Sequence, residues 1–93
     1  MQTNKSIAVV GSGWRAFTWF NIINVMSGVT LKTVVCRNAE KAEQIRIMYP
    51  HARVVADIEQ IESADHVLLC VNKASNVSVA ESLLARGYSV FCE

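Results

Sequence analysis

Short runs of apolar residues alternate along this chain with longer segments whose apolar positions recur at helical spacing. Runs rich in β-branched side chains are typical of buried strands, and apolar residues three or four positions apart are typical of helices. The apolar runs predict five strands, over residues 6–10, 30–36, 53–56, 66–71 and 88–92. The segments between them predict helices over 13–27 and 38–49, a short helix from residue 57, and a helix that starts at residue 75 or 76 and ends at residue 87.

Residues with distinct backbone preferences mark the ends of the predicted helices. Gly28 is expected to end the first helix, because glycine readily adopts the positive φ found at many helix ends. Asn38 is a suitable N-cap for the second helix, and Pro50 stops that helix. Asp57 and Gln60 have the spacing of a capping box, in which two side chains bind the backbone N–H groups at the start of a helix.

The alternation of strands and helices predicts the fold class. Strands joined through helices form parallel sheets with right-handed crossovers. We therefore expect a doubly wound α/β fold of the Rossmann type, with three layers and a sheet of five strands in the order 3-2-1-4-5. The ligand site of such a sheet lies at the carboxyl ends of strands one and four, where the order reverses. Because such folds normally continue, residues 1–93 are expected to be a truncated domain, the alternative being a complete minimal domain.

A glycine-rich hexapeptide connects the first predicted strand to the first predicted helix. It has the pattern G-x-G-x-x-A of a dinucleotide-binding fingerprint, and it reads Gly11-Ser12-Gly13-Trp14-Arg15-Ala16. In that pattern Gly11 permits a tight turn, Gly13 lets a pyrophosphate approach the backbone, and Ala16 lets the helix pack closely. The N–H groups of the first helical turn, aided by the helix dipole, would then bind the phosphates.

The two bulky residues of the hexapeptide each have two interpretations. Arg15 either covers the pyrophosphate or extends into solvent. Trp14 either lines the cofactor cleft or packs against parts of the protein that are absent from these 93 residues.

The end of the second predicted strand bears on the choice of cofactor. An acidic residue there would bind the ribose 2′-OH of NAD, but this chain has Cys36-Arg37-Asn38. A guanidinium can bind a 2′-phosphate through two hydrogen bonds, so Arg37 favours NADP over NAD. Asn38 and Lys41 would assist. The alternative is that Arg37 opens a solvated loop and that Lys41 is a solvated helix residue.

Composition and charge argue against two classes of partner. The net charge is +1 and no basic run is present, which argues against a nucleic-acid partner. The longest apolar run, Val67–Val71, is far shorter than the roughly 20 residues that cross a membrane. Because the first residues also lack the apolar core of a signal peptide, we expect a cytoplasmic protein with no membrane partner.

The cysteine residues suggest no metal site. Cys36, Cys70 and Cys92 lack the C-x-x-C spacing and are expected to be buried, reduced thiols. Cys36 and Cys70 belong to strands separated by a third strand, about 9–10 Å apart, which is too far for a disulfide. His51 and His66 have no partner pattern for catalysis and are expected to be structural or on the surface.

Two stretches resemble a known family. The stretch from Leu83 to Glu93 follows the run A-L-x-A-G-K-H-V-L through C-E-K-P that is typical of the Gfo/Idh/MocA family, and it stops at the glutamate. The stretch from Val34 to Ala42 is similar to the second strand and following turn of these proteins. Together with the fingerprint, the chain resembles the N-terminal NAD(P)-binding domain of these relatives of glucose–fructose oxidoreductase and inositol dehydrogenase.

The resemblance implies an oxidoreductase as the parent protein. It would transfer a hydride between nicotinamide and a hydroxyl-bearing carbon of a sugar, cyclitol or related substrate, and it would be a homo-oligomer. The family's catalytic lysine follows residue 93 and its substrate domain is absent, so the 93-residue chain is expected to contain no catalytic residue and to be inactive by itself.

The resemblance also implies roles in binding NADP or NAD. Gly11–Ala16 would hold the pyrophosphate, Arg37 and Asn38 would face the adenosine ribose, Val71, Asn72 and Lys73 would border the cofactor, and Glu93 would lie near the nicotinamide ribose. In one departure, Asn72 and Lys73 replace the prolines that often follow the fourth strand, and Asn76 replaces a histidine.

Two other functions remain open at this stage. One is a module that senses a dinucleotide without catalysis. The other is an S-adenosylmethionine-dependent methyltransferase, which shares a glycine-rich first loop. Cys36 and Arg37 argue against the methyltransferase, since an acidic residue usually ends its second strand.

Overall fold

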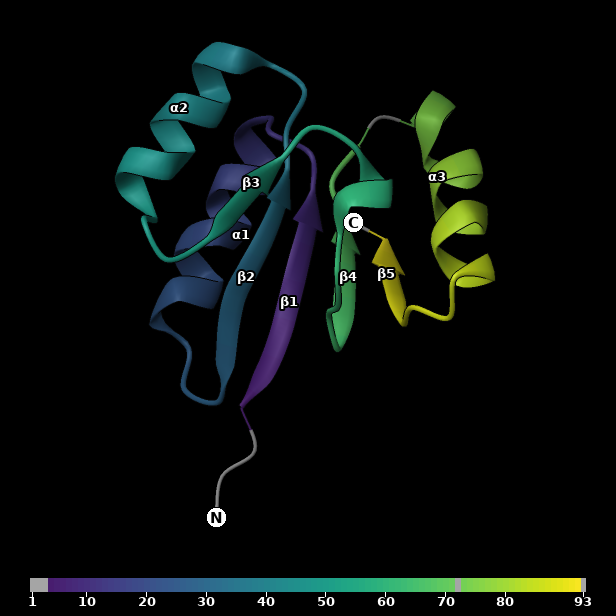
Figure 1. Cartoon of the computed structure of the whole chain (residues 1–93), viewed down its shortest axis with the longest axis horizontal. Helices are drawn as coiled ribbons and strands as arrows, with labels where there is room; N and C mark the ends of the chain where they lie inside the picture. Colours follow the sequence, from purple (N-terminus) through teal and green to yellow (C-terminus); the bar gives the residue numbers. More distant parts are fainter. Residues whose placement is uncertain (1–3, 72, 93) are drawn as a thin grey trace.

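The computed structural model describes residues 4–71 and 73–92, and only the backbone of 73–75. Its elements, in chain order, are β1 (Lys5–Val10), α1 (Trp14–Val25), β2 (Val29–Val35), α2 (Ala39–Met48), β3 (Arg53–Val55), the 3₁₀ helix η1 (Ile58–Gln60), β4 (His66–Leu69), α3 (Lys73–Ala85) and β5 (Val90–Cys92) (Figure 1). All strand pairs are parallel, in the order β3-β2-β1-β4-β5. The structure thus confirms the predicted Rossmann-type fold and its strand order.

Both faces of the sheet are covered, because successive residues of β1 point to opposite faces. Val9 packs with α1 and α2, whereas Ala8 and Val10 pack with the α3 side. Within α1, the residues predicted to face the sheet, Ala16 and Phe20, are fully buried. The three layers of the expected architecture follow from this alternation.

Two helix ends differ from their predicted positions because the chain uses the neighbouring residues for turns. α1 ends at Val25, before the turn in which Gly28 adopts a φ of +82°. At the end of α3, the Gly87 N–H donates to the Leu84 carbonyl and the Tyr88 N–H donates to the Leu83 carbonyl. This Schellman arrangement occupies Tyr88, so β5 starts later than predicted.

The start of α3 was predicted two or three residues too late. The helix begins at Lys73, so Ser75 and Asn76 lie inside it rather than at its N-cap. The capping-box residues were interpreted correctly: the Gln60 side-chain oxygen accepts from the N–H groups of Ala56 and Asp57 at 2.9 and 3.0 Å.

The cysteines are free thiols in the part of the chain that the structure describes. Cys36 is buried and Cys70 is half-buried, but Cys92 is exposed, so the expectation of three buried thiols is wrong. The reason is that Cys92 lies on β5, an edge strand. Within the same residues, no cluster of metal-ligating side chains is present, and no helix is long and apolar enough to cross a membrane.

Asp65 lies at the amino ends of the central strands β1 and β4, at the opposite end of these strands from the glycine-rich turn. Its carboxylate accepts from the Ser6 N–H at 2.8 Å, while its own N–H donates to the Ser6 carbonyl at 2.9 Å. The Ser6 backbone N–H holds the pKa of Asp65 below its ordinary value of 3.8, and the Ser6 hydroxyl and the nearby Lys5 charge act in the same direction. The hydrogen bonds from Ser6 therefore stabilise the ionised carboxylate of Asp65.

In Asp65→Asn we expect the free energy of unfolding to fall less steeply as pH is lowered into the acid range than it does in the wild type. Because the folded-state pKa is lowered, the contribution of Asp65 is present above the unfolded-state pKa and is lost as pH falls through the folded-state pKa. Urea unfolding at a series of pH values from neutral to strongly acidic measures this slope. Glu62→Gln is the control, and a variant with the same acid slope as the wild type contradicts the prediction.

Candidate functional site

The turn after β1 lies where β1, β2 and β4 end. The N–H of Gly11 donates to the Val35 carbonyl of β2 at 3.0 Å, and the N–H of Cys70 donates to the Val10 carbonyl at 2.8 Å. Gly11 has a φ of +127°, and a Cβ placed on it would lie 2.4 Å from the carbonyl oxygen of Cys70. The fold itself therefore requires glycine at position 11.

The fold does not require glycine at position 13. It is the N-cap of α1, with an extended φ of −76° that any residue adopts, and a Cβ on it would meet nothing within 4 Å. No side chain caps the described α1 helix and its first turn contains no acidic residue. The N–H groups at a helix start have no partner within the helix, so this end of α1 is suited to an anion.

A cleft of about 380 Å³ lies beside this turn, at the point where the strand order reverses. It is lined by Val10, Gly11, Ser12, Val35, Arg37, Ile58, Val71, Ser78 and Val79. The lining comes from the ends of β1 and β2, from η1, from the residue segment after β4, and from α3. The position matches the ligand site expected for a doubly wound sheet.

The structure brings four of the predicted cofactor residues to the cleft and leaves others outside it. Gly11, Ser12, Arg37 and Val71 line it. Ala16 is fully buried under the turn, where its small side chain lets α1 approach the sheet. The glycine-rich turn and the end of β2 therefore line one cavity, and their binding of a cofactor stays a prediction.

Trp14 and Arg15 do not line the cleft. The Trp14 side chain is 76% exposed, and the Arg15 guanidinium lies 5.4 Å from the centre of its ring. A cation over an aromatic face at this distance is a favourable contact. In this structure the two side chains therefore contact one another at the start of α1.

Asn38 caps α2 and does not line the cleft. Its side-chain oxygen accepts from the Lys41 N–H at 3.0 Å, which confirms the predicted N-cap of α2. Lys73 is the first residue of α3, and its side chain is not described. Asn72 and Glu93 lie outside the described residues.

Sequence reasoning missed two residues near Arg37, one in the cleft wall and one beside it. Ile58 lines it, and the Asp57 carboxylate lies 3.8 Å from the Arg37 guanidinium. Both side chains of the pair are exposed, at 85% for Arg37 and 57% for Asp57. The capping-box spacing located Asp57 at a helix start, but nothing in the sequence indicated that this start would face Arg37.

Comparison with known families gives this fold and cleft a context. The sequence model described as "Oxidoreductase family, NAD-binding Rossmann fold", that of Gfo/Idh/MocA, matches residues 5–93. The chain belongs to this family. A search of curated proteins found no match.

Solved structures with the same fold include several oxidoreductases. GenD2 from gentamicin A biosynthesis, in complex with NAD, has a TM-score of 0.89 and 21% identity over 99% of this chain and 27% of its own. The apo scyllo-inositol dehydrogenase from Lactobacillus casei has a TM-score of 0.87 and 20% identity over 99% of this chain and 28% of its own. This Gfo/Idh/MocA domain thus spans little more than a quarter of the length of those chains.

A third structure of the same fold is a putative oxidoreductase from Klebsiella pneumoniae, with a TM-score of 0.84 and 24% identity over 98% of this chain and 27% of its own. At these identities the similarity establishes the fold. The family match establishes that the chain is an NAD-binding Rossmann domain of Gfo/Idh/MocA oxidoreductases.

Proposed function

We propose that this domain binds NADP, and NAD less tightly, as the cofactor-binding part of an oxidoreductase that acts on a hydroxyl-bearing carbon of a sugar, cyclitol or related compound. The main support is Gly13, which the fold does not require, at the uncapped start of α1 and directly after Ser12, which lines the cleft. A glycine without a structural reason at such a place is explained by the close approach of a ligand to the backbone.

The binding roles follow from the geometry of the glycine-rich turn. The N–H groups between Gly11 and Ala16 would hold the pyrophosphate, with Ser12 on the cleft wall. Val71 would border the cofactor. We assign Asn72, Lys73 and Glu93 to the cofactor only through the family motif. When bound, the dinucleotide supplies a nicotinamide carbon that donates or accepts the hydride.

The remaining functions belong to the parent protein. We propose that it contains a substrate domain and a catalytic lysine outside residues 1–93, and that it is a homo-oligomer. The names of similar structures, among them a scyllo-inositol dehydrogenase and a myo-inositol 2-dehydrogenase, support a cyclitol or sugar substrate. The domain by itself would bind the cofactor without catalysing the reaction.

The preference for NADP rests on Arg37. Arg37 lines the cleft, and its guanidinium pairs only loosely with Asp57, at 3.8 Å and largely in solvent. Such an exposed pair contributes at most about 1 kcal/mol, so a 2′-phosphate can replace the carboxylate as the partner of Arg37. Asp57 acts against this preference, because its negative charge lies close to where the phosphate would bind.

Calorimetric titration of the chain with NADP, NAD and S-adenosylmethionine tests the function. We expect NADP to bind more tightly than NAD. Arg37→Ala should lower NADP affinity about tenfold, the effect of losing a charge-assisted hydrogen bond, and should leave NAD affinity nearly unchanged. Asp57→Asn should raise NADP affinity, since it removes the opposing charge.

Three outcomes would count against these assignments. Equal NADP affinity in the wild type and in Arg37→Ala contradicts the role of Arg37. Tight binding of S-adenosylmethionine with no binding of either dinucleotide indicates a methyltransferase-type site. Absence of binding by NADP and NAD overturns the proposed function.

A further inference from the structure

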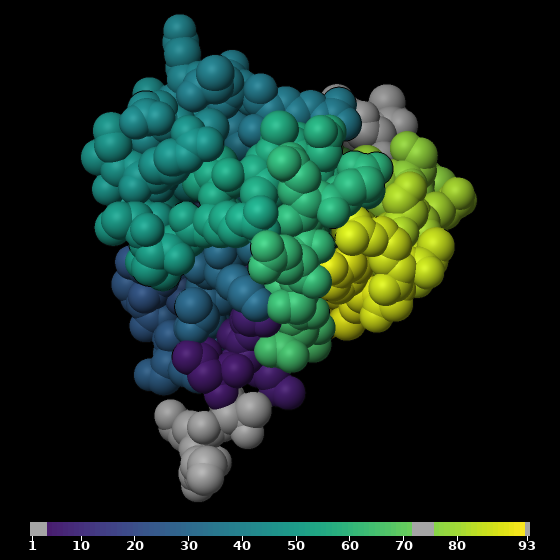
Figure 2. All heavy atoms as spheres, viewed as in Figure 1, coloured from purple at the N-terminus to yellow at the C-terminus, as the bar shows by residue number. Residues whose placement is uncertain are grey.

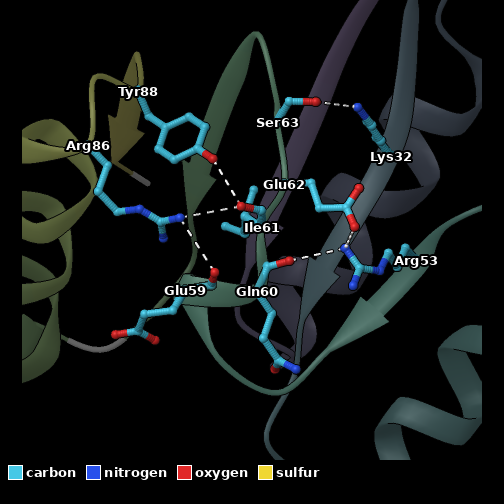
Figure 3. A network of polar contacts seen from close by, with 9 residues as sticks. All are labelled: Lys32, Arg53, Glu59, Gln60, Ile61, Glu62, Ser63, Arg86 and Tyr88. Carbon is cyan, nitrogen blue, oxygen red and sulfur yellow. Dashed lines mark hydrogen bonds and ion pairs between the residues drawn. The ribbon is translucent and has the colours of Figure 1, made fainter.

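A cluster of hydrogen bonds joins the end of α3 to the turn formed by η1. The Arg86 guanidinium donates to the backbone carbonyls of Ile58 at 2.7 Å, Ile61 at 3.4 Å and Glu59 at 3.5 Å. The hydroxyl of Tyr88 donates to the same Ile61 carbonyl at 3.2 Å (Figure 3). Figure 3 shows both side chains reaching across from the α3 side toward this turn.

The chemistry of the turn explains why a guanidinium is placed there. The Ile58 carbonyl accepts from the Ile61 N–H at 3.1 Å, and its second lone pair is available to a further donor. A planar guanidinium has several N–H donors and can bind more than one carbonyl at once. Tyr88 adds to this arrangement, because the Arg86 guanidinium lies 5.6 Å from the centre of its ring.

The family motif does not contain this arrangement. In the run A-L-x-A-G-K-H-V-L, alanine occupies the position of Arg86 and lysine the position of Tyr88. An alanine side chain has no donor for a carbonyl. We call the hydrogen bonds from Arg86 and Tyr88 to the η1 turn the clamp.

The clamp connects two walls of the candidate cleft. Ile58 lines the cleft from η1, whereas Ser78 and Val79 line it from α3. Figure 2 shows the segment from β3 through η1 in teal and green directly beside the yellow-green and yellow of α3 and β5. Because Arg86 directly follows α3 and binds the Ile58 carbonyl, it fixes the η1 wall relative to the α3 wall.

We propose that Arg86 is a positioning residue for the adenosine end of the dinucleotide. It does not touch the cofactor; it holds Ile58 in the cleft wall, next to the loop from which Asp57 faces Arg37. Without Arg86 the turn would sample other positions, and part of the binding free energy would go into ordering it. This inference rests on the proposed function, since it needs a dinucleotide in the cleft.

The test compares Arg86→Met and Arg86→Lys with the wild-type chain. Calorimetry with NADP and with ADP-ribose should give an affinity about fivefold lower for Arg86→Met, and Arg86→Lys should recover part of the loss, since lysine keeps a charged donor. In ligand-free samples the methyl NMR signal of Ile58 should shift and broaden in Arg86→Met. Reduced nicotinamide mononucleotide, which lacks the adenosine, should bind the variant and the wild type equally.

Arg53→Met is the matched control. Arg53 also contacts this turn, donating to the Gln60 carbonyl at 3.1 Å and pairing with Glu62 at 3.1 Å, but it belongs to β3 and not to α3. We expect Arg53→Met to retain wild-type affinity for ADP-ribose. If Arg86→Met fails to fold, Tyr88→Phe removes one hydroxyl from the same turn and should give a loss of about twofold.

The possible failures are distinguishable. If the wild type binds NADP and Arg86→Met binds it equally well, the positioning role is wrong while the proposed function stands. If Arg53→Met weakens ADP-ribose binding as much as Arg86→Met does, general loosening of the turn explains the effect and the link to α3 is wrong. If the wild type binds no dinucleotide, the proposed function fails, and the positioning role fails with it.

Discussion

Gly11→Ala is expected to lower the free energy of unfolding by about 3 kcal/mol, a large fraction of the stability of a domain of this size. Two effects combine at this position. Its φ of +127° is strained for any residue with a side chain, and the new methyl group would lie 2.4 Å from the Cys70 carbonyl oxygen. That oxygen belongs to the backbone at the end of β4, so it cannot move aside without shifting the strand. Urea unfolding followed by circular dichroism measures the loss.

Gly28→Ala provides the matched control for Gly11→Ala. Gly28 also has a positive φ, of +82°, but a Cβ there would meet nothing within 4 Å. The control therefore carries the backbone strain without the collision and should lose only about 1 kcal/mol. If both variants lose the same stability, the close approach of β4 to the turn does not limit position 11.

The strands and their order were predictable because each depends on local sequence and a few general rules. Short runs rich in β-branched residues, such as Thr30–Cys36, are typical of strands, and helices between successive strands indicate parallel crossovers. Ala16 and Phe20 lie one helical turn apart, so their shared buried face followed from the helical period. The location of the cleft then followed from the strand order alone.

The contacts across the cleft were not predictable because they depend on how separate loops meet. Arg37 was expected near the adenosine ribose, but its pairing with Asp57 requires β3 and the η1 turn to end beside β2. The bonds between Arg86 and the η1 turn join residues 25 to 28 positions apart. Helical periodicity and capping patterns relate only residues close in sequence, so they do not indicate these bonds. The acceptors are also backbone carbonyls, which every residue type has, so the sequence does not show which residues Arg86 would bind.

The exposed residues show a second limit of sequence reasoning. Trp14 does not line the cleft and is 76% exposed beside Arg15. The alternative, that it packs against a part of the protein outside these 93 residues, stays a prediction. Apolar character predicts burial only where an element has a neighbour to pack against. Trp14 lies two residues before Ala16 and therefore on a different face of α1 from Ala16 and Phe20, which are buried.

Gly13→Val is expected to reduce NADP affinity about 100-fold or more while leaving the fold intact. The backbone at position 13 is extended and its surroundings are open, so the folded chain accepts a side chain there, with stability within about 1 kcal/mol of the wild type. A bound pyrophosphate would need the same space, and a branched side chain would hold it away from the N–H groups of the first turn. Calorimetry with NADP and urea unfolding measure the two quantities on the same sample.

The pattern across the glycines decides whether the turn is a ligand site. Gly11→Ala should cost stability, Gly28→Ala should cost a little stability and no affinity, and Gly13→Val should cost affinity alone. Gly13→Ala, with one methyl group, should fall about tenfold in affinity, between the wild type and valine. A Gly13→Val protein that is stable and binds NADP as tightly as the wild type would mean that no phosphate approaches this backbone, and the proposed pyrophosphate site would be wrong. If only the Gly13 variants lose affinity without losing stability, Gly11 is the glycine that the fold needs and Gly13 the glycine that leaves space for the cofactor.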